Sequence, residues 1–577
     1  MLRLKKYITP YISAILLAIA LLFVQAMCDL ALPDYMSDIV NTGIVNGDTA
    51  YIIKTGALML LVSLLSAACT IIVGYLAALT AAGVSRRLRT DVFQKVENFS
   101  NAEFDQFSTA SLITRTTNDI IQVQMLLVMM IRMVFYAPIM GVGGVFRAVS
   151  KSASMSWIIG VAVLLLIGLI LILFSVAMPK FQRIQGLVDR LNLVVREHLD
   201  GMLVIRAFNT QKFEEERFDK ANRELTGTNL FVNRSMATMM PVMMLIMNLV
   251  TVVIVWVGAK QVSGFHMEVE DMMAYMQYAM QIIMSFLMMS MMFIMIPRAA
   301  VSADRVADVL ETEASILDPE EPEKFGEPFD GTLVFDHVSF RYPGAEDDVL
   351  KDISFTAKPG QTTAFIGATG SGKTTLVSLI PRFYDVTEGR ILLDGKDIRT
   401  VTRHDLREKI GYVPQKNVLF SGTIHSNLAY ADKNTSQENI ENAAAIAQAT
   451  EFITAKPEGY ETAIAQGGGN VSGGQKQRLS IARALVKNAP LSIFDDSFSA
   501  LDLKTDAALR AALREKTGGS TVILVAQRVS TIMNAEQIVV LDNGAVAGIG
   551  THKELLKTCE VYREIAMSQL SKQELEE

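Results

Sequence analysis

Six apolar segments in the first 300 residues constrain the fold of this chain more than any other feature. Each approaches or exceeds the roughly 20 apolar residues that an α-helix needs to cross a bilayer. They centre on residues 10–32, 56–80, 124–146, 155–178, 235–258 and 273–296. We therefore expect an α-helical membrane domain with six transmembrane helices over residues 1–311.

Basic residues mark one side of these segments. Arg3, Lys5 and Lys6 precede the first span, and the long connections after the second and fourth spans are also basic. The opposite connections are short and acidic. Because Lys and Arg collect on the cytoplasmic side of membrane proteins, we expect a multi-pass protein of the cytoplasmic membrane. Both termini and the whole second half of the chain are then cytoplasmic.

The two basic connections are long enough to form structures of their own. They contain no proline over residues 81–124 or 180–240, so both are compatible with helix. Two helical legs of about 20 residues each would project roughly 30 Å into the cytoplasm. The tips of these hairpins are expected near residues 108–116 and 201–209. Each hairpin is either a solvated surface feature or a lever that docks a cytoplasmic motor.

Methionine is concentrated in the last two spans, where 17 of the 31 methionines lie between Met236 and Met295. Flexible, polarizable Met side chains suit surfaces that adapt to varied apolar ligands, although ordinary helix packing explains many of them equally well. Gln277, Gln281 and Ser285 recur every four residues on the sixth span. This polar stripe is a candidate lining for a central, water-filled pathway.

The second half of the chain has the composition of a soluble α/β domain. An acidic, Pro-rich linker is expected over residues 312–330, followed by a domain over residues 331–577 whose last part, 553–577, forms an amphipathic helix with a charged tail. The net charge of −7 argues against a nucleic-acid partner. The three cysteines are too few for a disulfide framework and favour a reducing compartment.

The stretch FIGATGSGKTT, residues 365–375, follows an apolar strand and opens a helix. This pattern predicts a phosphate-binding loop, in which bare backbone amides, a lysine and a helix N-terminus surround the phosphates of a nucleotide. The Lys373 ammonium would neutralise phosphate charge, and the Thr374 hydroxyl would reach a magnesium ion. The expected nucleotide contacts are Gly367, Thr369, Gly370, Ser371, Gly372, Lys373, Thr374 and Thr375.

A second glycine-containing stretch, VSGGQKQRLSIARAL at residues 471–485, precedes an apolar strand that ends at Asp495. Together with the phosphate-binding loop, this signature resembles the ATP-binding cassette (ABC) transporters. The resemblance covers the whole chain, with six spans, two long hairpins and one cassette, in the manner of a half-transporter of the multidrug exporter type. It implies an α/β nucleotide-binding domain that uses ATP and Mg²⁺.

The resemblance assigns further roles residue by residue. Tyr342 corresponds to the aromatic residue that stacks on adenine, and Gln415 to a magnesium ligand that senses the membrane hairpins. Asp495 corresponds to the metal-binding aspartate, and Asp502 lies in the loop that communicates across the dimer. In this family each ATP lies between one cassette's phosphate-binding loop and the signature of another, here Ser472, Gly473, Gly474 and Gln475. This chain therefore needs a second half-transporter as its partner.

Three features depart from the family pattern. Asp496 occupies the place of the Glu that polarises the attacking water, and Gln527 the place of a His that contacts the γ-phosphate. Ala463 and Gln466 replace two glutamates ahead of the signature. Shortening Glu to Asp retracts the carboxylate by about 1 Å, a misplacement that can lower a rate by roughly 10²-fold. Gln527 also cannot become cationic as His can.

These departures are either harmless drift or signs of a degenerate site. Because two of them fall on the same nucleotide while the signature is intact, we favour an asymmetric heterodimer. In it, the nucleotide on this chain's own phosphate-binding loop is hydrolysed slowly. The second site combines this chain's signature with the Glu and His of a different subunit. The sequence thus resembles the degenerate-site subunit of a bacterial heterodimeric exporter.

The function that follows is ATP-driven export of amphipathic or hydrophobic small molecules. Export of a lipid or peptide is the alternative, although no Cys/His protease domain precedes the spans. A third possibility is an ATP-gated channel or regulatory subunit that transports nothing. The residues give no code for the substrate itself.

Overall fold

The computed structural model describes residues 2–516 and 519–570. The chain forms two compact units. A helical unit comprises Met1–Glu97 and Thr109–Thr312, and an α/β unit comprises Asn98–Ser108 and Glu313–Glu577. The α/β unit thus includes the short segment Asn98–Ser108, which in the sequence lies between the two parts of the helical unit.

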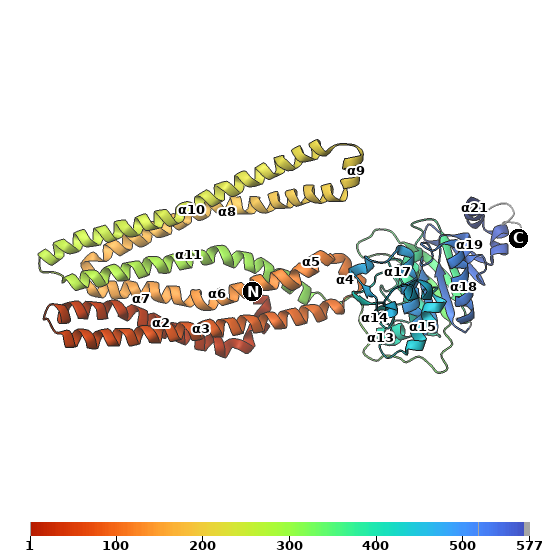
Figure 1. Ribbon diagram of the computed structural model, residues 1–577, viewed down its shortest axis with the longest axis horizontal. Coiled ribbons are helices and arrows are strands. Elements are labelled where there is room, and N and C mark those ends of the chain that lie inside the picture. The colour runs from red at the N-terminus through yellow and green to blue at the C-terminus, as the bar shows by residue number, and fades with distance from the viewer. Residues whose placement is uncertain (1, 517–518, 571–577) are drawn as a thin grey trace. The chain divides into compact units, whose positions relative to one another are not determined.

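Within the described residues, six helical stretches are long and apolar enough to cross a membrane, as the sequence predicts (Figure 1). They are Lys5–Ile44, Thr49–Glu97, Thr109–Lys151, Ala153–Ala177, Gln211–Ser263 and Val269–Ser290. The helices that build this unit are α1 (Lys5–Ile8), α2 (Ile12–Asp38), α3 (Thr49–Glu97), α5 (Thr109–Thr114), α6 (Ile120–Met129), α7 (Phe135–Lys151), α8 (Ser156–Asp200), α9 (Met202–Ala207), α10 (Gln211–Ser263) and α11 (Val269–Glu311). The short π-helical segment Met130–Val134, which contains Arg132, separates α6 from α7.

The helical unit is held together by interdigitated apolar side chains and by two buried tyrosines of α11. The Tyr275 hydroxyl donates to the Met155 carbonyl at 2.8 Å, and the Tyr278 hydroxyl donates to the Leu30 carbonyl at 3.1 Å. Buried Ile254 and Leu166 pack in the same core. Helices α8 and α10 run side by side as a separate hairpin (Figure 1).

The tips of the two hairpins differ in how well they were predicted. Helix α9 turns the second hairpin at Met202–Ala207, inside the expected 201–209. The first turn was predicted too late, at 108–116. It lies at Asn98–Ser108, around the short helix α4 (Asn101–Gln106). Ser100 and Glu103 start α4 with reciprocal hydrogen bonds, which is a helix-start signal that the prediction overlooked.

The α/β unit contains a six-stranded and a four-stranded sheet. The larger one is parallel except for its edge strand, with the order β12 (Ala545–Gly550), β11 (Gln537–Asp542), β3 (Thr362–Gly367), β10 (Thr521–Val525), β9 (Leu491–Asp495) and β6 (Ile410–Val413). The smaller, antiparallel sheet has the order β2 (Leu350–Ala357), β1 (Leu333–Phe340), β4 (Glu388–Leu393) and β5 (Lys396–Asp397). A two-residue pair, β7 (Gly422–Thr423) with β8 (Ala463–Ile464), completes the strands.

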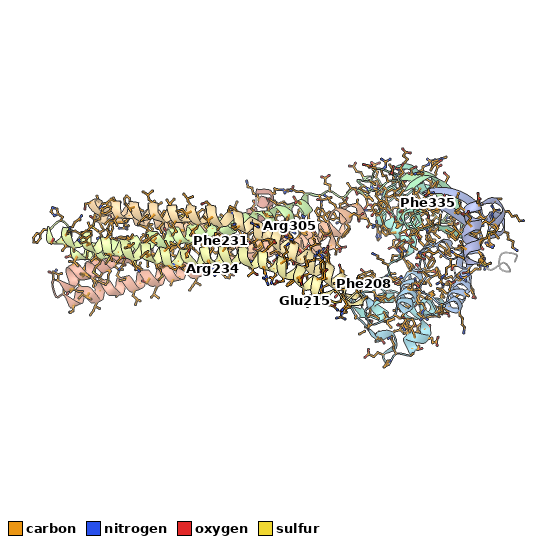
Figure 2. All side chains as sticks on the ribbon, turned by 90° about the horizontal axis from the view of Figure 1, so that it is seen from above. Phe208, Glu215, Phe231, Arg234, Arg305 and Phe335 are labelled. Carbon is orange, nitrogen blue, oxygen red and sulfur yellow. The ribbon has the colours of Figure 1, made fainter. Side chains whose placement is uncertain are left out.

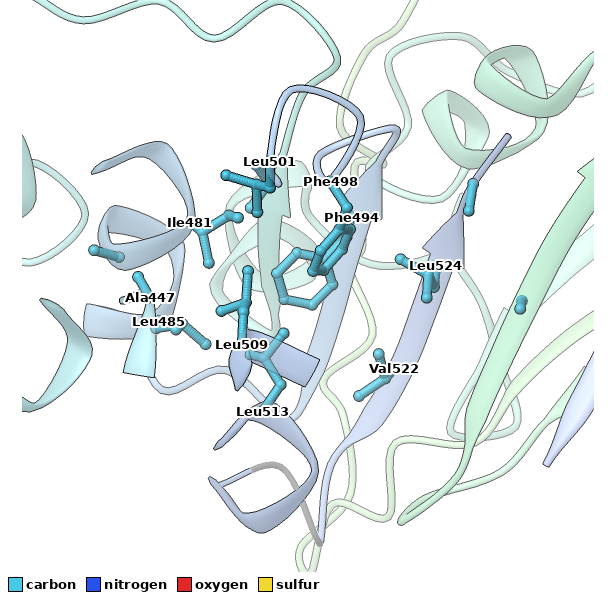
Figure 3. Close-up of a cluster of buried hydrophobic side chains, with 14 of the residues drawn as sticks. Ala447, Ile481, Leu485, Phe494, Phe498, Leu501, Leu509, Leu513, Val522 and Leu524 are labelled. Atoms are coloured by element: carbon cyan, nitrogen blue, oxygen red, sulfur yellow. The ribbon is translucent and has the colours of Figure 1, made fainter. Parts of the chain in front are cut away.

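Helices cover the larger sheet and connect its parallel strands, as parallel sheets require. They are α12 (Lys373–Leu379), α13 (Arg403–Glu408), α14 (Ile424–Leu428), α15 (Gln437–Ile446), α16 (Thr450–Thr454), α17 (Gly473–Val486), α18 (Leu503–Lys516) and α19 (Val529–Ile532). Figure 3 shows how Phe494 of β9 lies among side chains of α17, α18 and β10. This packing fixes the strand whose end carries Asp495 and Asp496.

The C-terminal segment is two helices and not the single amphipathic helix that was expected. Helix α20 spans His552–Thr558 and α21 spans Glu560–Gln569, with the break at Cys559 (φ −117°, ψ 110°). Leu555 of α20 and Tyr562 of α21 are both buried and pack in the same core. The predicted charged tail, residues 571–577, lies outside the described residues.

Candidate functional site

The predicted phosphate-binding loop joins β3 to α12. Gly370 and Gly372 have φ values of +86° and +96°, which favour glycine strongly. A Cβ atom on Gly367 would lie 2.1 Å from the Leu541 carbonyl oxygen, so this position tolerates no side chain. The loop therefore depends on its glycines for its shape, and its backbone amides precede the N-terminus of α12, where anions bind favourably.

The Lys373 side chain binds back to the residues at the start of the phosphate-binding loop. Its Nζ donates to the carbonyls of Gly367 at 2.9 Å and Ala368 at 2.8 Å, and to Ser371 Oγ at 3.3 Å. Burial lowers the pKa of the Lys373 ammonium, whereas the nearby carboxylates of Asp496 and Asp495 act in the opposite direction. The cation thus lies at the junction of the loop and the two carboxylates.

The predicted metal ligands Thr374 and Asp495 meet at the end of β9. Thr374 Oγ1 donates to Asp495 Oδ1 at 3.1 Å. Asp495 is only 1% exposed, and burial, together with the charge of Asp496, raises its pKa to about 6. Hydroxyl and carboxylate oxygens are the donors that Mg²⁺ prefers. A buried carboxylate that is costly to ionise gains from a cation, so these residues fit the ion.

Asp496 is the next residue, and amide groups surround its carboxylate. Gln527 Nε2 donates to Asp496 Oδ2 at 2.7 Å, and Gln415 Nε2 donates to the same oxygen at 3.4 Å. Burial raises the pKa of Asp496, while these two hydrogen bonds act against that rise. The residue adopts a left-handed conformation, φ +47°. The two positions that depart from the family pattern are therefore direct partners.

The signature begins helix α17. Ser472 and Gln475 form a reciprocal cap: Ser472 Oγ accepts from the Gln475 amide at 3.3 Å, and the Gln475 side chain accepts from the Ser472 amide at 3.1 Å. Ser472 and Gly473 are exposed. One turn later, Gln477 Nε2 donates to the Asp496 carbonyl at 3.4 Å. In residues 2–516 and 519–570, no hydrogen bond joins Ser472–Gln475 to the phosphate-binding loop.

The other predicted nucleotide contacts have local partners. The Tyr342 and Thr375 hydroxyls lie 2.9 Å apart, and the Tyr342 ring meets that of Tyr384 edge to face. Asp502 caps α18, because its carboxylate accepts from the Thr505 amide at 2.9 Å and the Thr505 hydroxyl at 2.7 Å. These contacts hold the Tyr342 ring and the loop before α18 in fixed positions.

Helix α4 is a part of the α/β unit that sequence reasoning did not assign there. The Tyr384 hydroxyl donates to Asp105 Oδ2 at 2.9 Å. Glu103 accepts from the Ser315 amide at 3.0 Å, so α4 is also tied to the start of the linker. The first hairpin turn is thus anchored beside Tyr342 through Tyr384.

The three residues of the predicted polar stripe on the sixth span differ in exposure and in hydrogen-bond partners. Gln277 is exposed, whereas Ser285 is buried and donates to the Ile282 carbonyl of its own helix. Gln281 Nε2 donates to the Asp29 carbonyl of α2 at 3.1 Å. The three residues therefore do not share one solvent-facing surface within this chain.

Comparison with known proteins agrees with this arrangement. The ABC transporter transmembrane region family matches residues 15–286, and the ABC transporter family matches residues 350–499. An uncharacterized ABC transporter ATP-binding protein of Mycobacterium tuberculosis is 40% identical over 98% of this chain and 97% of its own length. The ATP-dependent lipid A-core flippase of Pseudomonas aeruginosa is 32% identical over 96% of this chain and 93% of its own.

A solved structure of a bacterial Atm1-family ABC exporter with ATP bound superposes with a TM-score of 0.79 at 25% identity, and covers 99% of both chains. The predicted fold, a six-span membrane domain followed by an ABC nucleotide-binding domain, is confirmed. The chain belongs to the ABC transporter family, as a half-transporter of exporter fold whose ATPase domain is coupled to transport.

Proposed function

We propose that this chain is the degenerate-site half of a heterodimeric ABC exporter that moves amphipathic small molecules outward across the cytoplasmic membrane. The observation that carries this proposal is the 2.7 Å hydrogen bond from Gln527 to Asp496. It occupies an oxygen of the very carboxylate that would have to polarise the attacking water. With the shorter side chain of Asp, the catalytic pair Asp496 and Gln527 supports ATP binding with slow hydrolysis.

In this proposal the chain's own site binds and retains ATP. The loop residues Gly367 to Thr375 enclose the phosphates, and the Tyr342 ring stacks on the adenine. Thr374, Gln415 and Asp495 hold Mg²⁺, which would neutralise phosphate charge when bound. Gln415 donates to Asp496 Oδ2, the residue that follows the metal-binding Asp495, so the state of the nucleotide would reach the loop on which Gln415 lies.

The second site uses this chain's signature. Ser472, Gly473, Gly474 and Gln475 form a capped helix start of the kind that binds phosphate, with Ser472 and Gly473 exposed and the other two half-buried. Nothing in this stretch departs from the family pattern. We infer that it completes the partner's site, where the partner supplies the phosphate-binding loop, the Glu and the His. Asp502, beside it, lies in the loop that would face the partner.

The second hairpin supports the need for a partner. Large apolar residues at its tip are exposed, each with between 59% and 81% of its surface accessible. They are Leu199, Leu203, Val204, Phe208 and Phe213. Figure 2 shows Phe208 at the α9 end of this hairpin. Exposed apolar patches of this kind mark interaction sites. We propose that this tip docks on the cassette of the other subunit, while α4 docks on this chain's own cassette.

In the proposed organisation, residues 1–311 form the transmembrane domain except for Asn98–Ser108, which belongs to the α/β unit. Residues 312–330 form the linker and 331–577 the cassette, with both termini and the cassette in the cytoplasm. Closure of two cassettes on ATP would move the hairpins and switch the membrane domains from inward- to outward-facing, in the way that rigid-body alternation works in other transporters.

The substrate class rests on the apolar, Met-rich last spans and on the relatives. Met280 and Met284 of α11 are 44% and 47% exposed and offer adaptable apolar surface. A relative that is named a lipid A-core flippase favours a lipid as the second candidate cargo. Both candidates are amphipathic.

The test is vectorial transport by inverted membrane vesicles that contain this chain and the half-transporter encoded beside it. We expect uptake of an amphipathic fluorescent dye that requires ATP and Mg²⁺. A parallel assay with fluorescent phospholipid measures flipping and decides between the two cargo classes. Absence of uptake and of flipping, with ATP still hydrolysed, would replace the exporter by an ATP-gated channel or regulatory subunit.

A further inference from the structure

We propose that Asp29 and Gln281 form a binding site within the membrane domain for the ammonium group of an amine-bearing amphiphile. This inference rests on the exporter function proposed above and names the chemistry of its cargo. Asp29 lies inside the first span, on α2. Ionisable residues at such positions are costly and usually functional.

The Asp29 carboxylate is held by hydroxyl groups from two neighbouring helices. Ser66 Oγ of α3 donates to Oδ1 at 2.7 Å, and the Tyr136 hydroxyl of α7 donates to Oδ2 at 2.7 Å. Each carboxylate oxygen can accept two hydrogen bonds. The two hydroxyls thus orient the group and leave half of its acceptor capacity for a further donor.

The charge of this carboxylate is not neutralised within the chain. Among the described residues, no Lys, Arg or His lies within ion-pair distance of Asp29. The acidic residues at the outer end of the same bundle differ: Asp34 pairs with Arg147 at 2.9 Å, and Asp271 with Lys151 at 2.9 Å. Asp29 therefore has no cationic partner among the described residues, and a cationic ligand would supply one.

A second acceptor lies next to Asp29. The Gln281 Nε2 of α11 donates to the Asp29 carbonyl, which fixes the amide beside the carboxylate-bearing residue. Its Oε1 is buried and has no hydrogen-bond partner in the described structure. A buried acceptor without a donor is destabilising by about 1–3 kcal/mol. An ammonium group carries a positive charge and several N–H groups. These groups could donate hydrogen bonds to the Asp29 carboxylate and to Gln281 Oε1.

An exposed apolar side chain lies one turn from this pair of acceptors. Asp29 and Gln281 are half-buried, and Met284, one turn from Gln281, is 47% exposed. An apolar chain attached to the amine could lie against this exposed methionine. An anionic amphiphile, such as one with a carboxylate head, would be repelled by Asp29.

The test measures binding without ATP, with the full-length chain in phosphatidylcholine nanodiscs. The probes are a dansylated alkylamine and its N-acetylated, neutral counterpart. We expect the amine to bind about tenfold more tightly than the neutral probe. Asp29→Asn should abolish this preference, because it weakens binding of the amine probe and leaves binding of the neutral probe unchanged. Gln281→Leu should reduce the preference about threefold or more.

Asp38→Asn is the matched control, because it removes one negative charge from the exposed outer end of the same helix and should change neither affinity. If Asp29 only holds the helices together, Asp29→Asn will weaken both probes equally, and the inference is wrong. It is also wrong if the unmodified chain does not prefer the amine. Failure of the exporter function would instead appear as lost ATP-driven uptake of both probes, with the binding preference intact.

A second arm identifies the source of the amine. Nanodiscs that contain phosphatidylethanolamine offer a lipid amine to the same site. If a lipid is the ligand, these discs weaken binding of the dansylated amine by mass action, and Asp29→Asn removes the effect. Equal binding in both bilayers assigns the site to free amphiphilic amines.

Discussion

Gln527 donates its side-chain amide to the carboxylate of Asp496 across 2.7 Å. Gln415 approaches the same oxygen at 3.4 Å, so two uncharged donors share Oδ2, one of the two oxygens that could act as a general base. Asp496 and Gln527 both depart from the family pattern, and the two side chains are hydrogen-bonded to each other. In the proposed heterodimer, this contact stands where a longer carboxylate beside an imidazole would support fast hydrolysis.

The first prediction concerns Asp496 in the assembled heterodimer. Asp496→Asn should change the steady-state ATPase rate by less than about twofold, because this site contributes little turnover. The matching substitution at the partner's catalytic Glu should lower the rate by about 10²-fold or more. A malachite-green phosphate assay compares the two. A large loss from Asp496→Asn alone would show that this site is competent.

The second prediction concerns ATP binding at the same site. Lys373→Ala removes the cation that donates to the loop carbonyls of Gly367 and Ala368, and should weaken binding of a fluorescent ATP analogue by about tenfold or more. Lys358→Ala is the control, because Lys358 is an exposed lysine of the same cassette. Equal affinity in the two variants would mean that Lys373 does not contact the nucleotide.

The third prediction concerns transmission from the membrane domain to the cassette. Tyr384→Phe removes only the hydroxyl that donates to Asp105 of α4. We expect basal ATPase activity of the heterodimer to stay unchanged, whereas its stimulation by transported dye falls about threefold. Loss of basal and stimulated activity together would indicate a general defect of the cassette. Unchanged stimulation would show that this contact transmits nothing.

The fourth prediction concerns pH. Burial lowers the pKa of His552 below its ordinary value, and the charge of Lys553 adds to the effect. In the unfolded chain, His552 binds a proton below about pH 6.5, whereas in the folded chain it binds that proton only at lower pH. The folded state therefore becomes less stable as the pH is lowered through this window. His552→Gln should reduce the drop in Tm between about pH 7.5 and 5.5. His404→Gln, at an exposed position, should keep it.

Local patterns were sufficient to predict much of this molecule. The apolar runs determined the six spans, and the alternation before Phe340 predicted β1 (Leu333–Phe340). The phosphate-binding loop was placed correctly between β3 and α12 because glycine, lysine and helix-start signals all lie within a few residues. Features that arise from neighbouring residues in the chain were therefore readable from the sequence.

Contacts between distant residues were not readable. Nothing local places α4 in the α/β unit, since the Tyr384 to Asp105 bond joins residues 279 positions apart. The break at Cys559 was not readable either, because Leu555 and Tyr562, seven residues apart, would also share one face of an unbroken helix. Asp29 could have been noticed as an acidic residue within an apolar span, but its Ser66 and Tyr136 partners required the helix packing.

The most direct measurement of the degenerate-site proposal is the ATPase rate of the purified chain, self-paired in proteoliposomes without any partner. We predict a rate that is about 10²-fold below that of the Asp496→Glu, Gln527→His double variant, whose side chains restore the longer carboxylate and the ionisable ring. A wild-type chain that alone hydrolyses ATP as fast as the double variant would contradict the asymmetric heterodimer.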